Sequence, residues 1–134
     1  MFDNYVFTDP ASAHNVVEDG RVVGFQVETL STYYRGIPLS LVHEIELTID
    51  GVRVPRDEIV ISPNRGADWF TLLEAETVTT YRWEYGVQLL VRWLKDGGLP
   101  PGEHEVRISQ TTRVPYIPVP VGGERTRTIT VRAA

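Results

Sequence analysis

Hydrophobic and polar residues alternate along two stretches of the chain with the period of two that extended strands have. In Val23–Glu28, two valines and a phenylalanine alternate with Gly, Gln and Glu, and in Glu44–Asp50 apolar residues alternate with Glu, Thr and Asp. This pattern is typical of strands that pack one face on a core and leave the other face in water. The two stretches therefore predict half-buried β-strands.

Two short turns separate strands of this kind. Asp19-Gly20 and Asp50-Gly51 are two-residue sequences that favour tight β-hairpins. The second turn places Val52 opposite Ile49, so both side chains are expected on the same buried face.

The remaining chain contains further strand patterns and one short helical candidate. A short strand is predicted over Glu58–Ser62 and a central strand over Val87–Leu94, which is apolar on both faces. After a Gly- and Pro-rich corner a strand follows Gly102, and a last edge strand covers Arg125–Arg132. Phe70–Thr77 is the only candidate for a helical turn. About eight short strands without crossover helices predict an all-β fold, a single antiparallel β-sandwich domain over residues 1–134.

The corner sequence "LPPGEHEVRI" resembles the entry to a late strand in immunoglobulin-like and fibronectin-like sandwiches. His104 would stand roughly where those domains place a corner tyrosine. An immunoglobulin/fibronectin-like sandwich is therefore expected, with a structural role for His104. The resemblance is architectural and carries no activity.

Composition and charge narrow the class of protein. The net charge is −5 and the basic residues are scattered, which argues against binding to nucleic acid or to an anionic membrane. The chain has no cysteine, which excludes disulfides and thiolate metal sites. Met1–Pro10 lacks the basic and apolar regions of a signal peptide, so a cytoplasmic location is expected.

No familiar catalytic or metal-binding pattern is present. His14, His43 and His104 are far apart and have no metal-ligand spacing, and His43 and His104 are more simply interpreted as structural histidines. Neither Ser40 nor Ser62 lies in a nucleophile motif. We therefore predict neither a catalytic residue nor a metal site on this chain.

Three segments contain more aromatic and proline residues than simple connections need: Tyr33–Leu41, Tyr81–Gly86 and Arg113–Gly123. The prolines of the third segment exclude a paired central strand, so it is expected to run extended on the outside. Apolar loops on a rigid sandwich are typical of recognition surfaces, and Tyr, Trp and Arg dominate interface hot spots. The predicted partner or substrate contacts are Tyr34, Arg35, Gly36, Ile37, Pro38, Trp83, Tyr116, Ile117 and Pro118.

Two other interpretations of these segments stay open. Tyr81, Trp83 and Tyr85 alternate, so on an extended strand they would share one face and could stack on the face of a sugar ring. A sugar-binding module is one alternative function, although aromatic stripes are more often core. The other is an accessory domain without a ligand.

A colinear set of motifs resembles the small β-subunits of bacterial C-glycoside deglycosidases. The motifs are "MFDNYVF", "EDGRVVGFQV", "YYRGIPLSLV", "IELTIDGVRVPRDEI", "WEYG", "GGLPPGEHEV" and "YIPVP". They extend over nearly the whole chain in the same order as in that family.

The resemblance implies a non-catalytic β-subunit that works with a larger α-subunit of TIM-barrel fold. The family's complex cleaves the C–C bond between an aglycone, such as a flavonoid, and a 3-oxo sugar by metal-assisted acid/base elimination. The divalent metal, usually manganese, and the main catalytic residues are expected on the α-subunit, and no cofactor is expected on this chain. Tyr34–Pro38 and Tyr116–Pro118 would then help to cover the mouth of the barrel.

Overall fold

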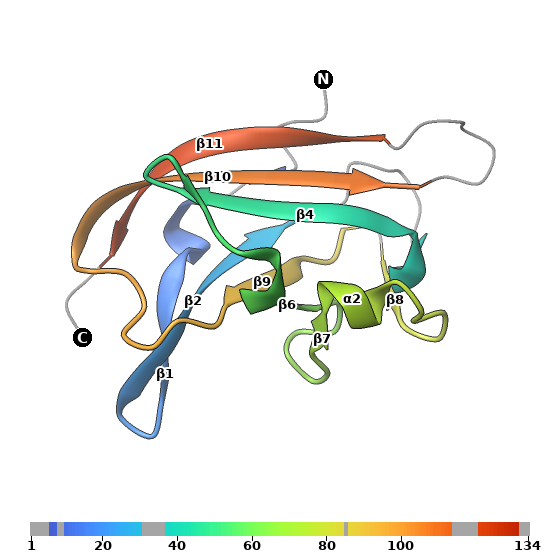
Figure 1. Cartoon of the computed structure of the whole chain (residues 1–134), viewed down its shortest axis with the longest axis horizontal. Coiled ribbons are helices and arrows are strands. Elements are labelled where there is room, and N and C mark those ends of the chain that lie inside the picture. The colour runs from blue at the N-terminus through green and yellow to red at the C-terminus, as the bar shows by residue number, and fades with distance from the viewer. Residues whose placement is uncertain (1–5, 8–9, 31–36, 85, 114–120, 132–134) are drawn as a thin grey trace.

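Two antiparallel β-sheets stack on each other in the computed structural model of this chain (Figure 1). The structure describes residues 6–7, 10–30, 37–84, 86–113 and 121–131, without the side chains of His43 and Val121. The strand order is β1-β2-β9-β6-β7 in the five-stranded sheet and β11-β10-β4-β5 in the four-stranded sheet, and β3 and β8 form a separate two-stranded ribbon. The all-β sandwich is confirmed, whereas the immunoglobulin/fibronectin identity stays a prediction.

The strands have the following bounds. The five-stranded sheet consists of β1 (His14–Glu18), β2 (Arg21–Thr29), β9 (Leu89–Trp93), β6 (Ile59–Ser62) and β7 (Phe70–Thr71). The four-stranded sheet consists of β11 (Val121–Val131), β10 (Gly102–Thr112), β4 (Val42–Ile49) and β5 (Val52–Arg53). The ribbon consists of β3 (Ile37–Pro38) and β8 (Arg82–Trp83). The predicted central strand is β9, and the predicted last edge strand is β11, which begins at Val121 instead of Arg125.

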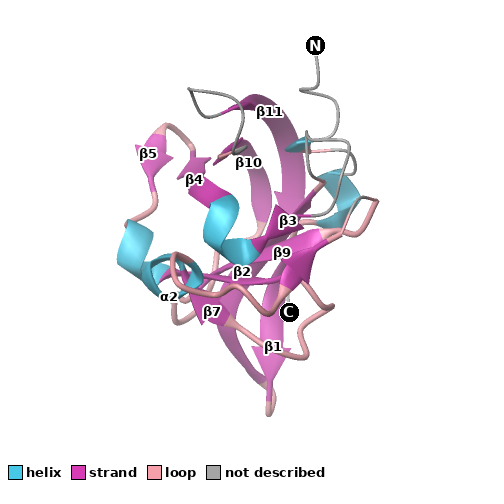
Figure 2. Ribbon diagram, turned by 90° about the vertical axis from the view of Figure 1, so that its right-hand side faces the viewer, coloured by secondary structure: helices cyan, strands magenta, loops and turns pink. Residues whose placement is uncertain are grey.

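Short helices connect some of these strands (Figure 2). Three are 3₁₀ turns: η1 (Pro10–Ser12), η2 (Leu39–Leu41) and η3 (Arg56–Glu58). The predicted helical turn is α2 (Leu72–Ala75). Thr71 Oγ1 accepts a hydrogen bond from the Glu74 amide at 3.0 Å, and the Glu74 carboxylate accepts one from the Thr71 amide at 2.9 Å. This reciprocal capping box fixes where the helix begins.

Both predicted hairpins are present. Asp19 and Gly20 have φ of 52° and 75°, and Asp50 and Gly51 have φ of 51° and 81°. Positive φ at both turn residues matches the twist of the flanking strands. Val52 pairs with Ile49 as expected but is 69% exposed, because β5 is a two-residue edge strand at the tip of its hairpin. The prediction that Val52 is buried is therefore wrong.

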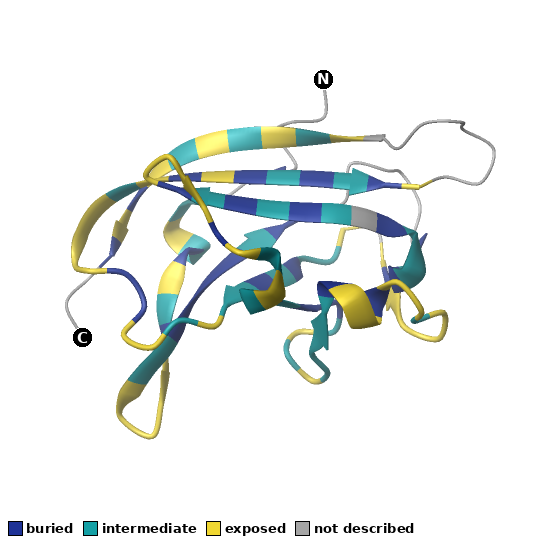
Figure 3. Ribbon diagram, viewed as in Figure 1, coloured by how far each residue is buried: buried dark blue, intermediate teal, exposed yellow. Residues whose placement is uncertain are grey.

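The core lies between the two sheets, where the buried positions of each strand alternate with accessible ones (Figure 3). Each sheet contributes mainly β-branched and leucine side chains, which fit a pleated surface. From the five-stranded sheet come Phe25, Val27, Ile59, Ile61, Leu89 and Val91. From the four-stranded sheet come Ile45, Leu47, Ile49, Val106, Ile108, Ile129 and Val131.

The outer face of β2 is less exposed than its alternating pattern predicts. Gly24 is buried and Gln26 is only 7% exposed. The Gln26 Oε1 atom accepts hydrogen bonds from Arg92 Nε at 3.1 Å and Nη2 at 2.9 Å, and the Arg92 guanidinium lies 4.1 Å from the centre of a Trp69 ring. The segment after β6 thus covers part of this face, and the prediction of a fully wet face is wrong here.

His104 connects the corner before β10 to the Asp50 hairpin. Its Nδ1 lies 2.6 Å from Asp50 Oδ2 and its Nε2 lies 2.7 Å from the Pro100 carbonyl oxygen. Both partners are acceptors, so both ring nitrogens donate when the imidazole is protonated. Asp50 Oδ1 also accepts a hydrogen bond from the Glu105 amide at 2.9 Å. The expected structural role of His104 is confirmed.

These contacts shift the pKa values of His104 and Asp50, so the stability of the fold should depend on pH. The Asp50 hydrogen bond, and then the Pro100 carbonyl, raise the pKa of His104, while the His104 and Glu105 hydrogen bonds lower the pKa of Asp50. The stabilisation from His104 is complete below its unfolded-state pKa of about 6.5 and is lost as the pH rises through the raised folded-state pKa. The stabilisation from Asp50 is lost at the acid end, as the pH falls through its lowered folded-state pKa.

Urea unfolding at several pH values would test this linkage. The free energy of unfolding should fall as the pH increases above about 6.5. His104→Gln should flatten that dependence, whereas His14→Gln, at an exposed position on β1, should leave it unchanged. An unaltered slope in His104→Gln would contradict the linkage.

Candidate partner-facing end of the sandwich

The described residues that flank parts of two predicted contact segments, Tyr33–Leu41 and Arg113–Gly123, lie at one end of the sandwich. Residues 31–36 are flanked by Leu30 and Ile37, and residues 114–120 by Arg113 and Val121. We call the region of these four flanking residues the loop-bearing end. The start of β4, the end of β10 and the start of β11 lie at this end (Figure 1).

Hydrogen bonds join the flanks of the two loops directly. Gln110 Nε2 donates to Thr29 Oγ1 and to the Leu30 carbonyl, both at 2.7 Å. The Arg113 amide donates to the Leu41 carbonyl at 2.7 Å. Since Thr112 pairs with both Val42 and Val121, the sheet continues to the point where the second loop begins. The flanks of both segments are therefore joined at one end of the sandwich, across its two sheets.

Gln110 is the central polar residue of this end. It is fully buried beside Thr29, which is also fully buried. Its Oε1 atom has no hydrogen-bond partner in the described part of the chain. The alternating pattern of β10 predicts a core position here, and only the long-range contact with β2 explains why a glutamine occupies it.

We expect Gln110→Met to destabilise the chain by about 1–3 kcal/mol, because it leaves Thr29 Oγ1 and the Leu30 carbonyl without a buried donor. Chemical denaturation would measure the loss. The double variant Gln110→Met with Thr29→Val should lose less than the sum of the single variants, because both members of one hydrogen bond are then apolar. Strict additivity would contradict the proposed coupling between β10 and the end of β2.

The β3–β8 ribbon closes the core at this end. Ile37 pairs with Trp83, and the Leu39 amide donates to the Tyr81 carbonyl at 3.0 Å. Trp83 is fully buried and its Nε1 donates to the Val87 carbonyl at 2.8 Å, while Ile37 is 3% exposed. Both were predicted as contact residues, but their side chains lie in the core because the ribbon turns them inward.

The other predicted contacts have different outcomes. Pro38 belongs to the ribbon and is partly buried. Six predicted contacts lie outside the described residues and stay predictions: Tyr34, Arg35, Gly36, Tyr116, Ile117 and Pro118.

The aromatic platform proposed for a sugar does not form as expected. Trp83 lies in the core, and the Tyr81 ring packs on Phe70 with 5.1 Å between ring centres. Tyr85 lies outside the described residues. Trp83 therefore cannot provide an exposed stacking surface.

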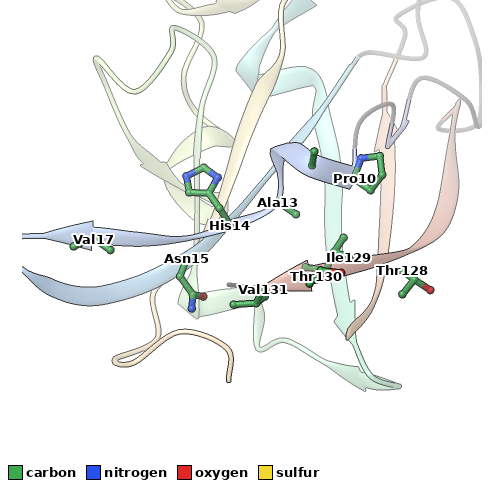
Figure 4. Close-up of a pocket in the computed structure, with 10 residues that line it drawn as sticks. Pro10, Ala13, His14, Asn15, Val17, Thr128, Ile129, Thr130 and Val131 are labelled. Atoms are coloured by element: carbon green, nitrogen blue, oxygen red, sulfur yellow. The ribbon is translucent and has the colours of Figure 1, made fainter. Parts of the chain in front are cut away.

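A groove with a volume of about 660 Å³ lies between the free edges of the two sheets (Figure 4). β1 forms one wall and the end of β11 the other, with Ala13, Val17 and Ile129 among the lining residues. Both strands are edges of their sheets, so each presents backbone groups along the groove. Sequence patterns give no signal for this groove, because it depends on how two distant edges meet.

The described part of the chain contains no group of three or more His, Asp or Glu side chains that could hold a metal ion. None of the described helices combines the length and apolar character needed to cross a membrane.

Comparison with known proteins supplies the family. The family model of the C-glycoside deglycosidase beta subunit matches residues 2–116. The 3′-dehydrocarminate deglycosidase beta subunit of Microbacterium sp. is 36% identical over 65% of this chain and 64% of its own length. The C-glycoside deglycosidase beta subunit of Arthrobacter globiformis is 32% identical over 76% of this chain and 74% of its own length. A C-glycoside deglycosidase beta subunit of Eubacterium cellulosolvens is 26% identical over 75% of this chain and 67% of its own length.

The aligned part of the chain thus spans just under two thirds of the Microbacterium relative and somewhat more of the other two. The family model covers all but the end of the chain after residue 116, including the predicted loop 31–36 and the β3–β8 ribbon. The chain belongs to the C-glycoside deglycosidase beta subunit family.

Proposed function

We propose that this chain is the β-subunit of a cytoplasmic C-glycoside deglycosidase and functions only in complex with a TIM-barrel α-subunit. The observation that carries the proposal is the family match over residues 2–116. The complex would be a carbon–carbon lyase that separates a 3-oxo sugar from an aromatic aglycone such as a flavonoid. The β-subunit would contribute no catalytic residue.

The loop-bearing end supports a particular orientation. It brings the flanks of both predicted contact segments together at one end of the sandwich, so a single partner surface could meet both segments. Recognition loops positioned by a rigid scaffold are a common arrangement. We propose that this end faces the mouth of the α-subunit barrel.

The expected reaction explains why the barrel mouth would need a cover. A ketone at C3 of the sugar acidifies the proton on C2, so a base can remove that proton and a C1–C2 double bond can form. The bond from C1 to the aglycone then breaks, and its electron pair is protonated on the aglycone carbon. Covering the barrel mouth would exclude water and hold the flat aglycone in place. The divalent metal, proposed as manganese, would belong to the α-subunit.

Separate purification of this chain and the α-subunit from the same organism would test the proposal. Mixing them should give a stable complex that cleaves a 3-oxo-C-glycoside, whereas this chain alone should be inactive. Activity of the isolated chain would refute the non-catalytic role.

Arg35→Ala should weaken association with the α-subunit by about 1–3 kcal/mol if Arg35 is an interface hot spot. A cross-subunit affinity measurement would detect the change. The control is Arg21→Ala at the distant β1–β2 hairpin, where Arg21 forms an exposed ion pair with Asp96. Equal affinities for wild type and Arg35→Ala would place Arg35 outside the interface and favour a different docking face.

A further inference from the structure

A polar cleft lies on the outer face of the five-stranded sheet, on the side away from the core. Its volume is about 400 Å³. We call it the outer cleft. The lining residues that the inference uses are Gln26, Glu28, Arg65, Val87, Gln88 and Leu90.

The floor of the cleft comes from two central strands. On β2 the outward positions are Gln26 and Glu28, and in the β2–β9 register Glu28 stands opposite Leu90. Val87 and Gln88 precede β9 and line the same cleft. The floor therefore combines the apolar side chains of Val87 and Leu90 with amide and carboxylate groups.

One wall of the cleft is the loop after β6. Ser62 Oγ accepts a hydrogen bond from the Gly66 amide at 2.8 Å, and Asn64 Oδ1 accepts one from the Asp68 amide at 3.0 Å. Arg65 lies between these contacts with a left-handed φ of 60°. A non-glycine residue in this conformation is uncommon and is maintained here by the side-chain bonds on either side. The loop thus holds the base of the arginine at the rim of the cleft.

The cleft contains charges of both signs that the described chain does not pair. Neither the carboxylate of Glu28 nor the guanidinium of Arg65 has an ion-pair or hydrogen-bond partner among the described residues, although Glu28 is partly buried. The side-chain amide of Gln26 has a fixed orientation, because its Oε1 accepts hydrogen bonds from both Arg92 Nε and Arg92 Nη2. Its Nε2 is not used in these two bonds. The cleft thus offers hydrogen-bond donors from Arg65 and the Gln26 amide and an acceptor from Glu28.

The charged and amide groups of the outer cleft determine which class of ligand fits it. A phosphate would meet the carboxylate of Glu28, a metal cation would meet Arg65, and an apolar ligand would leave the polar groups without partners. Vicinal hydroxyl groups both donate and accept, so they satisfy Glu28, Arg65 and the amides together, while ring C–H groups contact Leu90. We propose that the outer cleft is a binding site for a single pyranose ring.

This site goes beyond the proposed function and does not depend on it. The outer cleft belongs to this chain alone, and no α-subunit is needed for a sugar to bind there. It also differs from the aromatic platform considered from sequence, because neither Tyr81 nor Trp83 is among the described residues that line it. A failure of the pyranose proposal would leave complex formation untouched.

Titration of the full isolated chain with methyl β-D-glucopyranoside would test the site, with backbone and side-chain amide resonances followed by NMR. For a ligand of this size in an open cleft, we expect a dissociation constant on the order of 1 mM. The shifts should be largest for Gln26, Gln88 and the segment around Arg65. Leucine, a zwitterion that could pair with both charges, serves as the competing probe.

Glu28→Gln and Arg65→Asn should each weaken binding at least about tenfold, because each removes a charged hydrogen-bonding group. Asparagine tolerates the left-handed backbone at position 65, so the loop should keep its shape. The matched control is Glu103→Gln, an exposed carboxylate on β10, which should bind like wild type. Saturable binding of leucine without binding of the glucoside would overturn the proposal, as would unchanged affinity in both cleft variants or no saturable binding at all.

Discussion

Trp83→Ala is expected to lower the free energy of unfolding by about 3–5 kcal/mol, the loss typical of removing a buried aromatic side chain. Trp83 is fully buried, pairs with Ile37 across the β3–β8 ribbon and donates to the Val87 carbonyl. Its removal leaves a cavity at the loop-bearing end and an acceptor without its donor. Urea denaturation followed by circular dichroism would measure the loss.

Leu73→Ala is the matched control, since Leu73 on α2 is 69% exposed and should change stability by no more than about 0.5 kcal/mol. Trp83→Phe should retain most of the packing and lose mainly the indole hydrogen bond, about 1–3 kcal/mol. If Trp83→Ala cost as little as Leu73→Ala, the ring would lie at the surface, as the sugar-platform alternative requires.

The second large effect is expected for Gly24→Ala. Gly24 lies in β2, and a β-carbon at this position would overlap the backbone carbonyl oxygen of Trp93 in the neighbouring strand β9. A backbone atom cannot rotate away, so the two central strands must separate. We expect a loss of about 3 kcal/mol or more, the upper end for overpacking.

Gly20→Ala is the comparison for this change. A β-carbon at Gly20 meets nothing within 4 Å, but its φ of 75° is unfavourable for alanine. The expected cost is therefore only the left-handed backbone strain, about 1–2 kcal/mol. A larger loss for Gly20→Ala than for Gly24→Ala would show that β2 and β9 can separate at little cost.

Local patterns predicted the features of the fold that depend on neighbouring residues. Asp19-Gly20 and Asp50-Gly51 form hairpins because Asp and Gly tolerate the positive φ that such turns need. The alternation around Leu47 identified the buried face of β4. Thr71 and the residues after it formed the single predicted helical turn through a local capping box.

Patterns failed where a distant segment decides the burial of a side chain. Gln26 lies on a face that looks wet, but Arg92, 66 residues away in sequence, binds it and covers it. Trp83 was predicted as a partner or substrate contact, yet its pairing with Ile37 turns it into the core. No local pattern predicts the outer cleft for the same reason, since Glu28 and Arg65 line one cleft only after β2 and the loop following β6 are assembled.

The candidate site was predicted only in part. Family motifs marked the loops that contain Arg35 and Tyr116, and the structure shows that the roots of both loops are joined at one end through Gln110 and the end of β10. No local pattern could reveal that connection, because Gln110 and Leu30 are 80 residues apart in sequence.

The central proposal is that this chain is the non-catalytic partner of a separate α-subunit. The most direct measurement is cleavage of a 3-oxo-C-glycoside by this chain, by the α-subunit and by their mixture, with association followed in the same samples. We expect the two proteins to form a stable complex, and we expect efficient cleavage by the mixture but by neither protein alone. Cleavage by this chain alone, or failure of the two proteins to associate, would contradict it.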